Sequence, residues 1–97
     1  MTQVIFSDEA RLEALDSFHG YEERRRGLGG VFKAELDAAI GRVSEEPLAF
    51  PVYYRDLRRV LVGRFPYAVY YRTYPDLVVI VAVFHGRRNP DALRRRT

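Results

Sequence analysis

The sequence predicts an α+β domain of two layers, in which an antiparallel sheet packs against a hairpin of two helices. Between residues 8 and 46, the apolar residues recur at the three- and four-residue spacing of amphipathic helices. Residues 57–84 are instead rich in β-branched residues and tyrosine, which is typical of strands. A short β-like segment precedes the helices, so the predicted order is β-α-α-β-β-β. The 97 residues fit one domain, 1–97, in which the helices bury their apolar stripes on the sheet.

The first predicted helix follows the short strand 3–6. Ser7 is a suitable N-cap, and two acidic residues follow it in the first turn. The helix should end near Arg26, because the glycine-rich segment 27–30 breaks it. Its apolar stripe is Ala10, Ala14, Phe18 and Tyr21, with Leu15 beside it.

The second predicted helix begins near Gly30 and ends before Pro47, since proline cannot continue a helix. Its apolar stripe is Phe32, Leu36, Ala39, Ile40 and Val43. Two helices joined by so few residues should pack as an antiparallel pair.

The second half of the chain is predicted to form three strands. The predicted segments are a loop over 48–56, strands over 57–62, 67–74 and 77–84, turns over 63–66 and 75–76, and a flexible basic tail over 91–97. The last strand is apolar on both faces, so it should be central and covered on both sides. Because the helices cover one face, the tail, a loop or another chain must cover the other.

Charge and composition limit the classes of function that the chain can have. Residues 1–48 carry a net charge of −4 and residues 49–97 a net charge of +7, and arginine supplies all the basic residues except Lys33. This basic half indicates an anionic partner or, alternatively, a solvated basic face. The lack of cysteine and the presence of only two histidines argue against disulfides and metal sites. No apolar run approaches the length of a membrane span and no secretory signal is evident, so we expect a cytoplasmic protein without a cofactor.

Five stretches, taken in order, resemble the RelE/ParE superfamily of toxins from type II toxin–antitoxin modules. They are GLGGVFKAEL (27–36), AAIGRVSEEPLAFP (38–51), LRRVLVGRFPYAVYYRT (57–73), DLVVIVAVFHG (76–86) and RRNP (87–90). Within the superfamily the chain looks most like ParE-type members. The resemblance implies a small bacterial protein that a cognate antitoxin holds inactive in a hetero-oligomer.

The resemblance also allows two mechanisms. RelE-type members cleave messenger RNA on the ribosome with strand lysines and arginines and a C-terminal tyrosine, whereas ParE-type members poison DNA gyrase. The corresponding positions here are Ala68 for the strand arginine, Arg59 and Leu61 for the lysine pair, Leu93 or Arg94 for the tyrosine, and Arg87 or Arg88 for the arginine after the last strand. The absence of the main cation and the tyrosine favours the ParE-like mechanism, which involves no catalysis by the toxin.

We therefore expect a growth-inhibiting gyrase poison that an antitoxin neutralises. A ribosome-dependent mRNA endonuclease and a non-toxic protein that only binds an antitoxin are the alternatives. The candidate target-binding residues are Arg59, Arg64, Arg72, Arg87 and Arg88, and the candidate antitoxin-binding residues are Phe18, Tyr21, Phe32, Leu36 and Tyr70. If the protein cleaves RNA, the catalytic candidates are Arg59, His85 and Arg88. His85 has no serine, cysteine or aspartate partner at a catalytic spacing, so we expect it to close its strand with a hydrogen bond.

Overall fold

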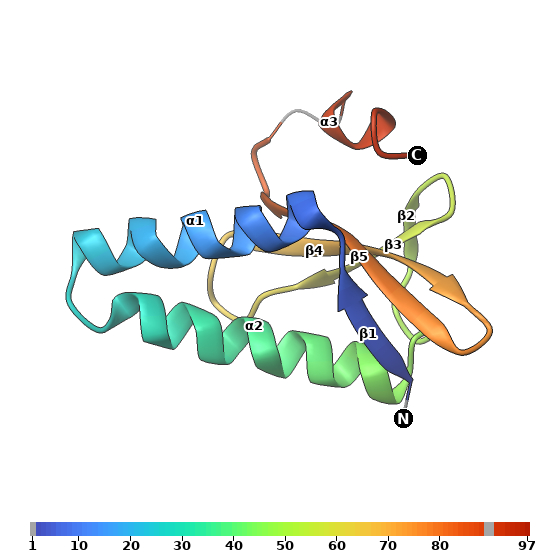
Figure 1. The fold of residues 1–97 in the computed structure, drawn as a ribbon, viewed down its shortest axis with the longest axis horizontal. Helices are drawn as coiled ribbons and strands as arrows, with labels where there is room; N and C mark the ends of the chain where they lie inside the picture. Colours follow the sequence, from blue (N-terminus) through green and yellow to red (C-terminus); the bar gives the residue numbers. More distant parts are fainter. Residues whose placement is uncertain (1, 89–90) are drawn as a thin grey trace.

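The computed structural model describes residues 2–88 and 91–97, so Asn89 and Pro90 of the RRNP stretch lie outside the described residues. Its elements are β1 (Gln3–Phe6), α1 (Asp8–Arg24), α2 (Leu28–Glu45), β2 (Val52–Tyr54), β3 (Leu57–Leu61), β4 (Tyr67–Tyr74), β5 (Leu77–His85) and α3 (Asp91–Arg94). Helices α1 and α2 lie side by side against a five-stranded sheet (Figure 1). The predicted α+β class, with two helices on a mostly antiparallel sheet, is confirmed.

Helix α1 begins where the sequence predicts it, because Ser7 caps it. The backbone N–H of Ala10 donates to Ser7 Oγ at 3.1 Å, which satisfies an amide group that the helix itself leaves unpaired. The helix ends at Arg24 rather than near Arg26, and α2 begins at Leu28, slightly earlier than predicted.

Glu22 holds the short connection between the two helices. Its carboxylate accepts hydrogen bonds from the backbone N–H groups of Gly27, at 2.9 Å, and Gly29, at 3.0 Å. The N-cap position of α2 provides no side-chain hydrogen bond, so Glu22 supplies the acceptor and the negative charge that favour this helix end. Gly29 also permits close packing, because a Cβ there would lie 2.7 Å from the carbonyl oxygen of Phe18.

The strand order in the sheet is β1-β5-β4-β3-β2, which places β5 and β4 near the middle. The pairs from β2 to β5 are antiparallel, but β1 pairs with β5 in parallel, in register from Gln3 with Leu77 to Phe6 with Ile80. A fully antiparallel sheet was therefore the wrong prediction for this edge. The residue pattern marks each segment as a strand but carries no information on the direction in which distant strands pair.

A second correction concerns the predicted loop over 48–56, because Val52–Tyr54 forms the edge strand β2. It pairs with β3 through a tight connection in which Arg55 adopts a φ of 53°. Three residues are too few to show the alternation by which a strand is predicted, and proline directly precedes them.

The main core lies between the helices and one face of the sheet. Phe32 and Tyr71 are the largest of its fully buried side chains. The Tyr71 hydroxyl donates to the carbonyl oxygen of Pro47 at 2.7 Å, so the polar end of this buried ring is satisfied. An aromatic cluster of Tyr21, Phe32, Phe65 and Tyr67 joins the helices to the turn before β4, with ring centroids 4.9 to 5.9 Å apart.

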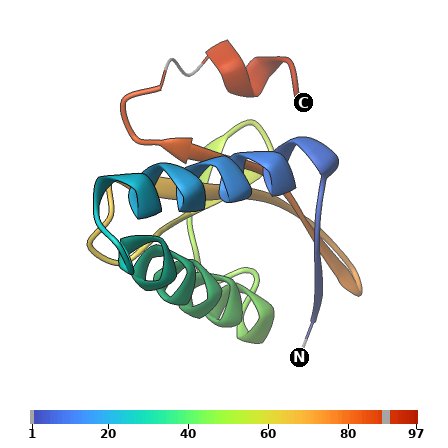
Figure 2. The ribbon, with the colours of Figure 1, turned by 60° about the vertical axis from the view of Figure 1, so that its left-hand side comes forward.

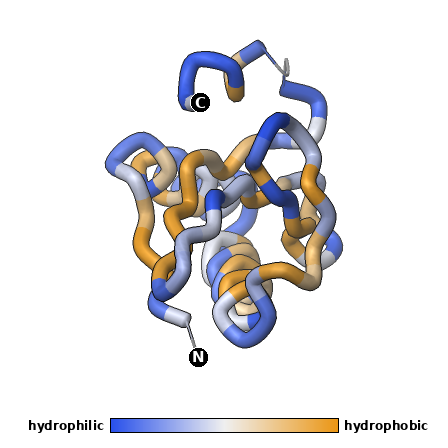
Figure 3. Tube along the Cα trace, turned by 90° about the vertical axis from the view of Figure 1, so that its right-hand side faces the viewer, coloured by the Kyte–Doolittle hydropathy of each residue, from blue (hydrophilic) through white to orange (hydrophobic). Residues whose placement is uncertain are grey.

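The C-terminal segment covers part of the other face of the sheet, which was one of the three predicted possibilities. Ala92 and Leu93 of α3 pack in a second buried cluster with Ala68, Tyr70 and Phe84. The segment predicted to be a flexible tail forms the helical turn α3, in which Leu93 supplies an apolar anchor and is 1% exposed. Figures 2 and 3 show this segment folded back over the body of the domain, mostly hydrophilic with a short hydrophobic stretch.

Within the described residues, no helix has the length and apolar character needed to cross a membrane.

Candidate functional site

An apolar groove lies on the helical hairpin. It has a volume of about 540 Å³. We call it the helix groove, and its lining residues are Phe6, Arg11, Ala14, Leu15, Phe18, Phe32, Lys33, Leu36 and Asp37. Phe32 and Leu36 form its buried floor, whereas Leu15 is 47% exposed. Its apolar floor and charged rim are typical of a surface that receives an amphipathic segment.

Three of the five predicted antitoxin-binding residues, Phe18, Phe32 and Leu36, line the helix groove. Tyr21 lies instead in the aromatic cluster of the core, where burial raises its pKa, Tyr67 raises it further and Arg24 lowers it. Tyr70 is buried on the opposite face of the sheet, and burial also raises its pKa, although Arg59 acts in the opposite direction. The structure therefore does not bring these five residues onto one surface.

The five predicted target-binding arginines differ in whether they already bind another side chain of the domain. Arg72 donates to both carboxylate oxygens of Asp56, at 2.6 and 3.4 Å, and this hydrogen bonding lowers the pKa of Asp56. Arg88 bonds to Glu13 at 3.1 Å and lies 4.1 Å from the ring centroid of Phe84. Both arginines thus have structural roles that the sequence did not indicate.

Arg64 and Arg87 are exposed and form no ion pair among the residues that the structure describes. Their segments meet at one end of the sheet, where the backbone N–H of Gly86 donates to the carbonyl oxygen of Pro66 at 2.7 Å. Arg59 is half-buried and lies over the ring of Tyr53, 4.1 Å from its centroid. Arg64 and Arg87 are thus the predicted arginines best placed to meet an anionic partner.

The resemblance to RelE-type nucleases matches several positions of this chain to nuclease residues. Ala68, Leu61 and Leu93 are the apolar ones, and they lie in or beside the second buried cluster, under α3. Ala68 and Leu93 are buried there, and Leu61 is exposed on the same face of the sheet, opposite Ala68 in the strand register. Apolar side chains therefore occupy these three positions, whereas Arg59 and Arg88 keep a charge at two of the others. Ala68, Leu61 and Leu93 offer neither a proton acceptor nor a cation for phosphoryl chemistry.

Glu13 joins three parts of the fold that are distant in sequence. Its carboxylate accepts the Val83 backbone N–H at 3.0 Å, on the part of β5 beyond its pairing with β1. Arg96 binds both of its oxygens at 2.8 Å and also donates to the Val81 carbonyl oxygen at 2.9 Å. The hydrogen bond to Glu13 raises the pKa of Arg96. These side chains take the place of a neighbouring strand at this edge and hold the C-terminal segment against α1.

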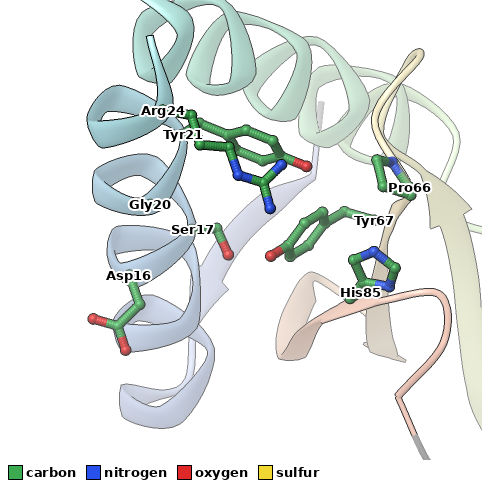
Figure 4. Close-up of a pocket in the computed structure, with 8 residues that line it drawn as sticks. All are labelled: Asp16, Ser17, Gly20, Tyr21, Arg24, Pro66, Tyr67 and His85. Carbon is green, nitrogen blue, oxygen red and sulfur yellow. The ribbon is translucent and has the colours of Figure 1, made fainter. Parts of the chain in front are cut away.

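A second, polar pocket of about 230 Å³ lies between α1 and the ends of β4 and β5. We call it the tyrosine pocket, and its lining residues are Asp16, Ser17, Gly20, Tyr21, Arg24, Pro66, Tyr67 and His85 (Figure 4). The ring of Tyr67 lies between those of Tyr21 and His85, with centroids 5.9 and 5.4 Å away. The sequence had singled out His85 but gave no sign that Arg24 and Tyr67 would join it.

His85 has the structural role that the sequence predicted. Its Nδ1 accepts the backbone N–H of Arg87 at 3.1 Å, and its carbonyl oxygen accepts that of Arg88 at 2.9 Å. These two bonds close the turn after β5. Among residues 2–88 and 91–97, no group of three or more potential ligands is arranged to hold a metal ion.

Comparison with known proteins gives consistent matches. The family described as "ParE toxin of type II toxin-antitoxin system, parDE" matches residues 4–90. The chain is 36% identical over 63 residues to "Toxin ParE2" of two Mycobacterium tuberculosis strains, CDC 1551 / Oshkosh and ATCC 25618 / H37Rv. This match covers 65% of the chain and 60% of those relatives. A structure titled "Chromosomal ParDE TA system from P. aeruginosa" superposes with a TM-score of 0.76 at 10% identity, over 88% of this chain and 96% of the other, which shows a shared fold.

Proposed function

Because the chain belongs to the ParE toxin family of type II toxin–antitoxin systems, we propose that it is the growth-inhibiting toxin of such a module. A cognate antitoxin neutralises it, and free toxin acts in the cytoplasm by poisoning DNA gyrase. The observation that supports this most is the helix groove, an open apolar surface on a chain whose family is defined by pairing with an antitoxin.

The antitoxin segment that fits the helix groove is an amphipathic helix. Leu15 and Phe18 offer apolar contacts from α1, and Leu36 offers them from the floor. Arg11 and Lys33 on the rim would meet acidic residues of the partner, and Asp37 already pairs with Lys33 at 2.7 Å. Such a segment gains most of its affinity from apolar burial, and the rim charges set its orientation.

Gyrase poisoning is supported over RNA cleavage, because the buried Ala68 and Leu93 stand where a RelE-type nuclease has a strand arginine and a C-terminal tyrosine. Target contact is assigned to the exposed arginines Arg64 and Arg87, with Arg59 as a further candidate. Arg72 and Arg88 contribute indirectly, because their ion pairs fix the sheet surface and the C-terminal segment.

Two variants test whether the antitoxin binds the helix groove and the target binds a different surface. Leu15→Asp places a charge in the helix groove and should weaken antitoxin binding about 100-fold or more, since an unpaired charge in an apolar contact costs at least about 3 kcal/mol. Growth inhibition by the free toxin should persist. Leu61→Asp, on the far face and also exposed, is the matched control and should leave antitoxin binding unchanged. Equal affinities of the two variants for the antitoxin would contradict the assignment of the helix groove.

Expression without the antitoxin tests the activity. We expect growth arrest with a DNA-damage response. Intact DNA with cleaved messenger RNA would support the nuclease alternative, and unimpaired growth with retained antitoxin binding would support the non-toxic alternative.

A further inference from the structure

The tyrosine pocket shares no residue with the helix groove, and the proposed function uses none of its hydrogen-bonding groups. Its walls come from three elements far apart in the sequence: Arg24 and Tyr21 from α1, Tyr67 from β4 and His85 from β5. From the groups that these elements bring together, we propose that the pocket binds a single anionic group, a phosphoryl or a carboxylate.

Arg24 supplies the charge. Its guanidinium lies 5.3 Å from the ring centroid of Tyr21 and forms no ion pair within the described parts of the chain. The stacking holds the guanidinium over the pocket, while its N–H groups remain free to bind oxygen. In Figure 4 the Arg24 side chain extends over the pocket towards Tyr67. An arginine held in this way is suited to bind a carboxylate or a phosphate.

Tyr67 and His85 add hydrogen-bond donors on the opposite wall. The Tyr67 hydroxyl points into the space between α1 and β4 (Figure 4). Since Nδ1 of His85 accepts the Arg87 N–H, the neutral imidazole carries its proton on Nε2, which is left to donate to a ligand. A guanidinium and two neutral donor groups therefore belong to residues that line one small pocket, and a set of donors of this kind suits an anion.

The remaining polar residues are compatible with this assignment. Ser17 donates its hydroxyl proton to the Glu13 carbonyl oxygen at 2.8 Å, so it lines the pocket without adding charge. Asp16 is the acidic member, and its carboxylate points away from the other labelled side chains (Figure 4). The acidic side chain among the lining residues is thus directed out of the pocket.

Titration with inorganic phosphate and, separately, with acetate tests the proposal on the full chain, followed by two-dimensional ¹H–¹⁵N NMR. We expect saturable shifts of the Gly20, Gly86 and Arg87 amides and of the His85 imidazole in at least one titration. Saturation by phosphate alone would identify a phosphoryl site, and saturation by acetate alone would identify a carboxylate site. Absence of saturation by both anions would overturn the proposal.

Single substitutions distinguish binding of the anion in the tyrosine pocket from its nonspecific attraction to a basic surface. Arg24→Gln should weaken binding about tenfold or more, because it removes the charge-assisted hydrogen bonds. Arg26→Gln removes the same charge from an exposed position near the same helix end and should leave the affinity unchanged. Tyr67→Phe keeps the ring in the aromatic cluster and should also weaken binding. Equal affinities for the two arginine variants, or shifts centred on other arginines, would contradict the assignment.

Discussion

Glu13→Gln should destabilise the fold far more than the loss of an exposed carboxylate. The Glu13 and Arg96 side chains are 16% and 12% exposed, and two hydrogen bonds of 2.8 Å join them. The substitution leaves Arg96 with Glu9, at 3.4 Å, as its remaining ion-pair partner among the described residues. Removing one partner of a buried pair costs about 3–5 kcal/mol, and the partial exposure together with Glu9 reduces our expectation to about 2–3 kcal/mol.

The assay is urea unfolding followed by circular dichroism, with Asp37→Asn as the matched control. Asp37 pairs with Lys33 on an exposed helix surface, where the side chains are 59% and 65% exposed, so its loss should cost about 0.3–0.5 kcal/mol. Glu13→Gln should also lower Tm by about 10–20 °C, as expected for a domain of this size. Similar free energies of unfolding for the two variants would refute the role of Glu13 as a buried cross-link.

Three further predictions concern the fold. Leu93→Ala should cost about 2–4 kcal/mol, because it leaves a cavity under α3; a loss well below 1 kcal/mol in urea unfolding would mean that α3 is not anchored. Ser7→Ala should cost about 1 kcal/mol through the lost cap, and an unchanged midpoint would contradict that role. The lowered pKa of Asp56 contributes stability above its ordinary titration range, which is lost as pH falls through the lowered pKa. Arg72→Gln should return this pKa towards its ordinary value in an NMR titration, and no change would refute the pairing.

Local signals in the sequence predict most of the fold. The Ser7 cap, the two helical stripes and the strand-like segments each depend on residues within a few positions of one another, and each has its counterpart in the structure. The parallel pairing of β1 with β5 and the packing of the C-terminal segment depend on contacts between distant residues. Leu93 is a lone large apolar residue in a basic stretch, and only the apolar surface of the folded sheet makes it an anchor.

The candidate sites were predictable to a smaller extent for the same reason. Phe18 and Leu36 reach the helix groove because the helical stripe places them on the hairpin. The sequence could not show which arginines are already paired, since Arg72 meets Asp56 across the sheet and Arg88 meets Glu13 from 75 residues away. A cation at the end of a helix complements the helix dipole, so the sequence gives no further reason to single out Arg24, and only the folded chain reveals its place beside Tyr67 and His85.

The central claim is that this chain inhibits growth by poisoning gyrase, and incubation of the purified protein with gyrase, ATP and supercoiled DNA tests it most directly. We predict that gyrase–DNA cleavage complexes accumulate with the native protein. They should be strongly reduced with Arg64→Ala/Arg87→Ala, but not with Arg26→Ala/Arg95→Ala, which loses the same charge from other exposed positions. A native protein that arrests growth but leaves no cleaved DNA in this assay would contradict the claim.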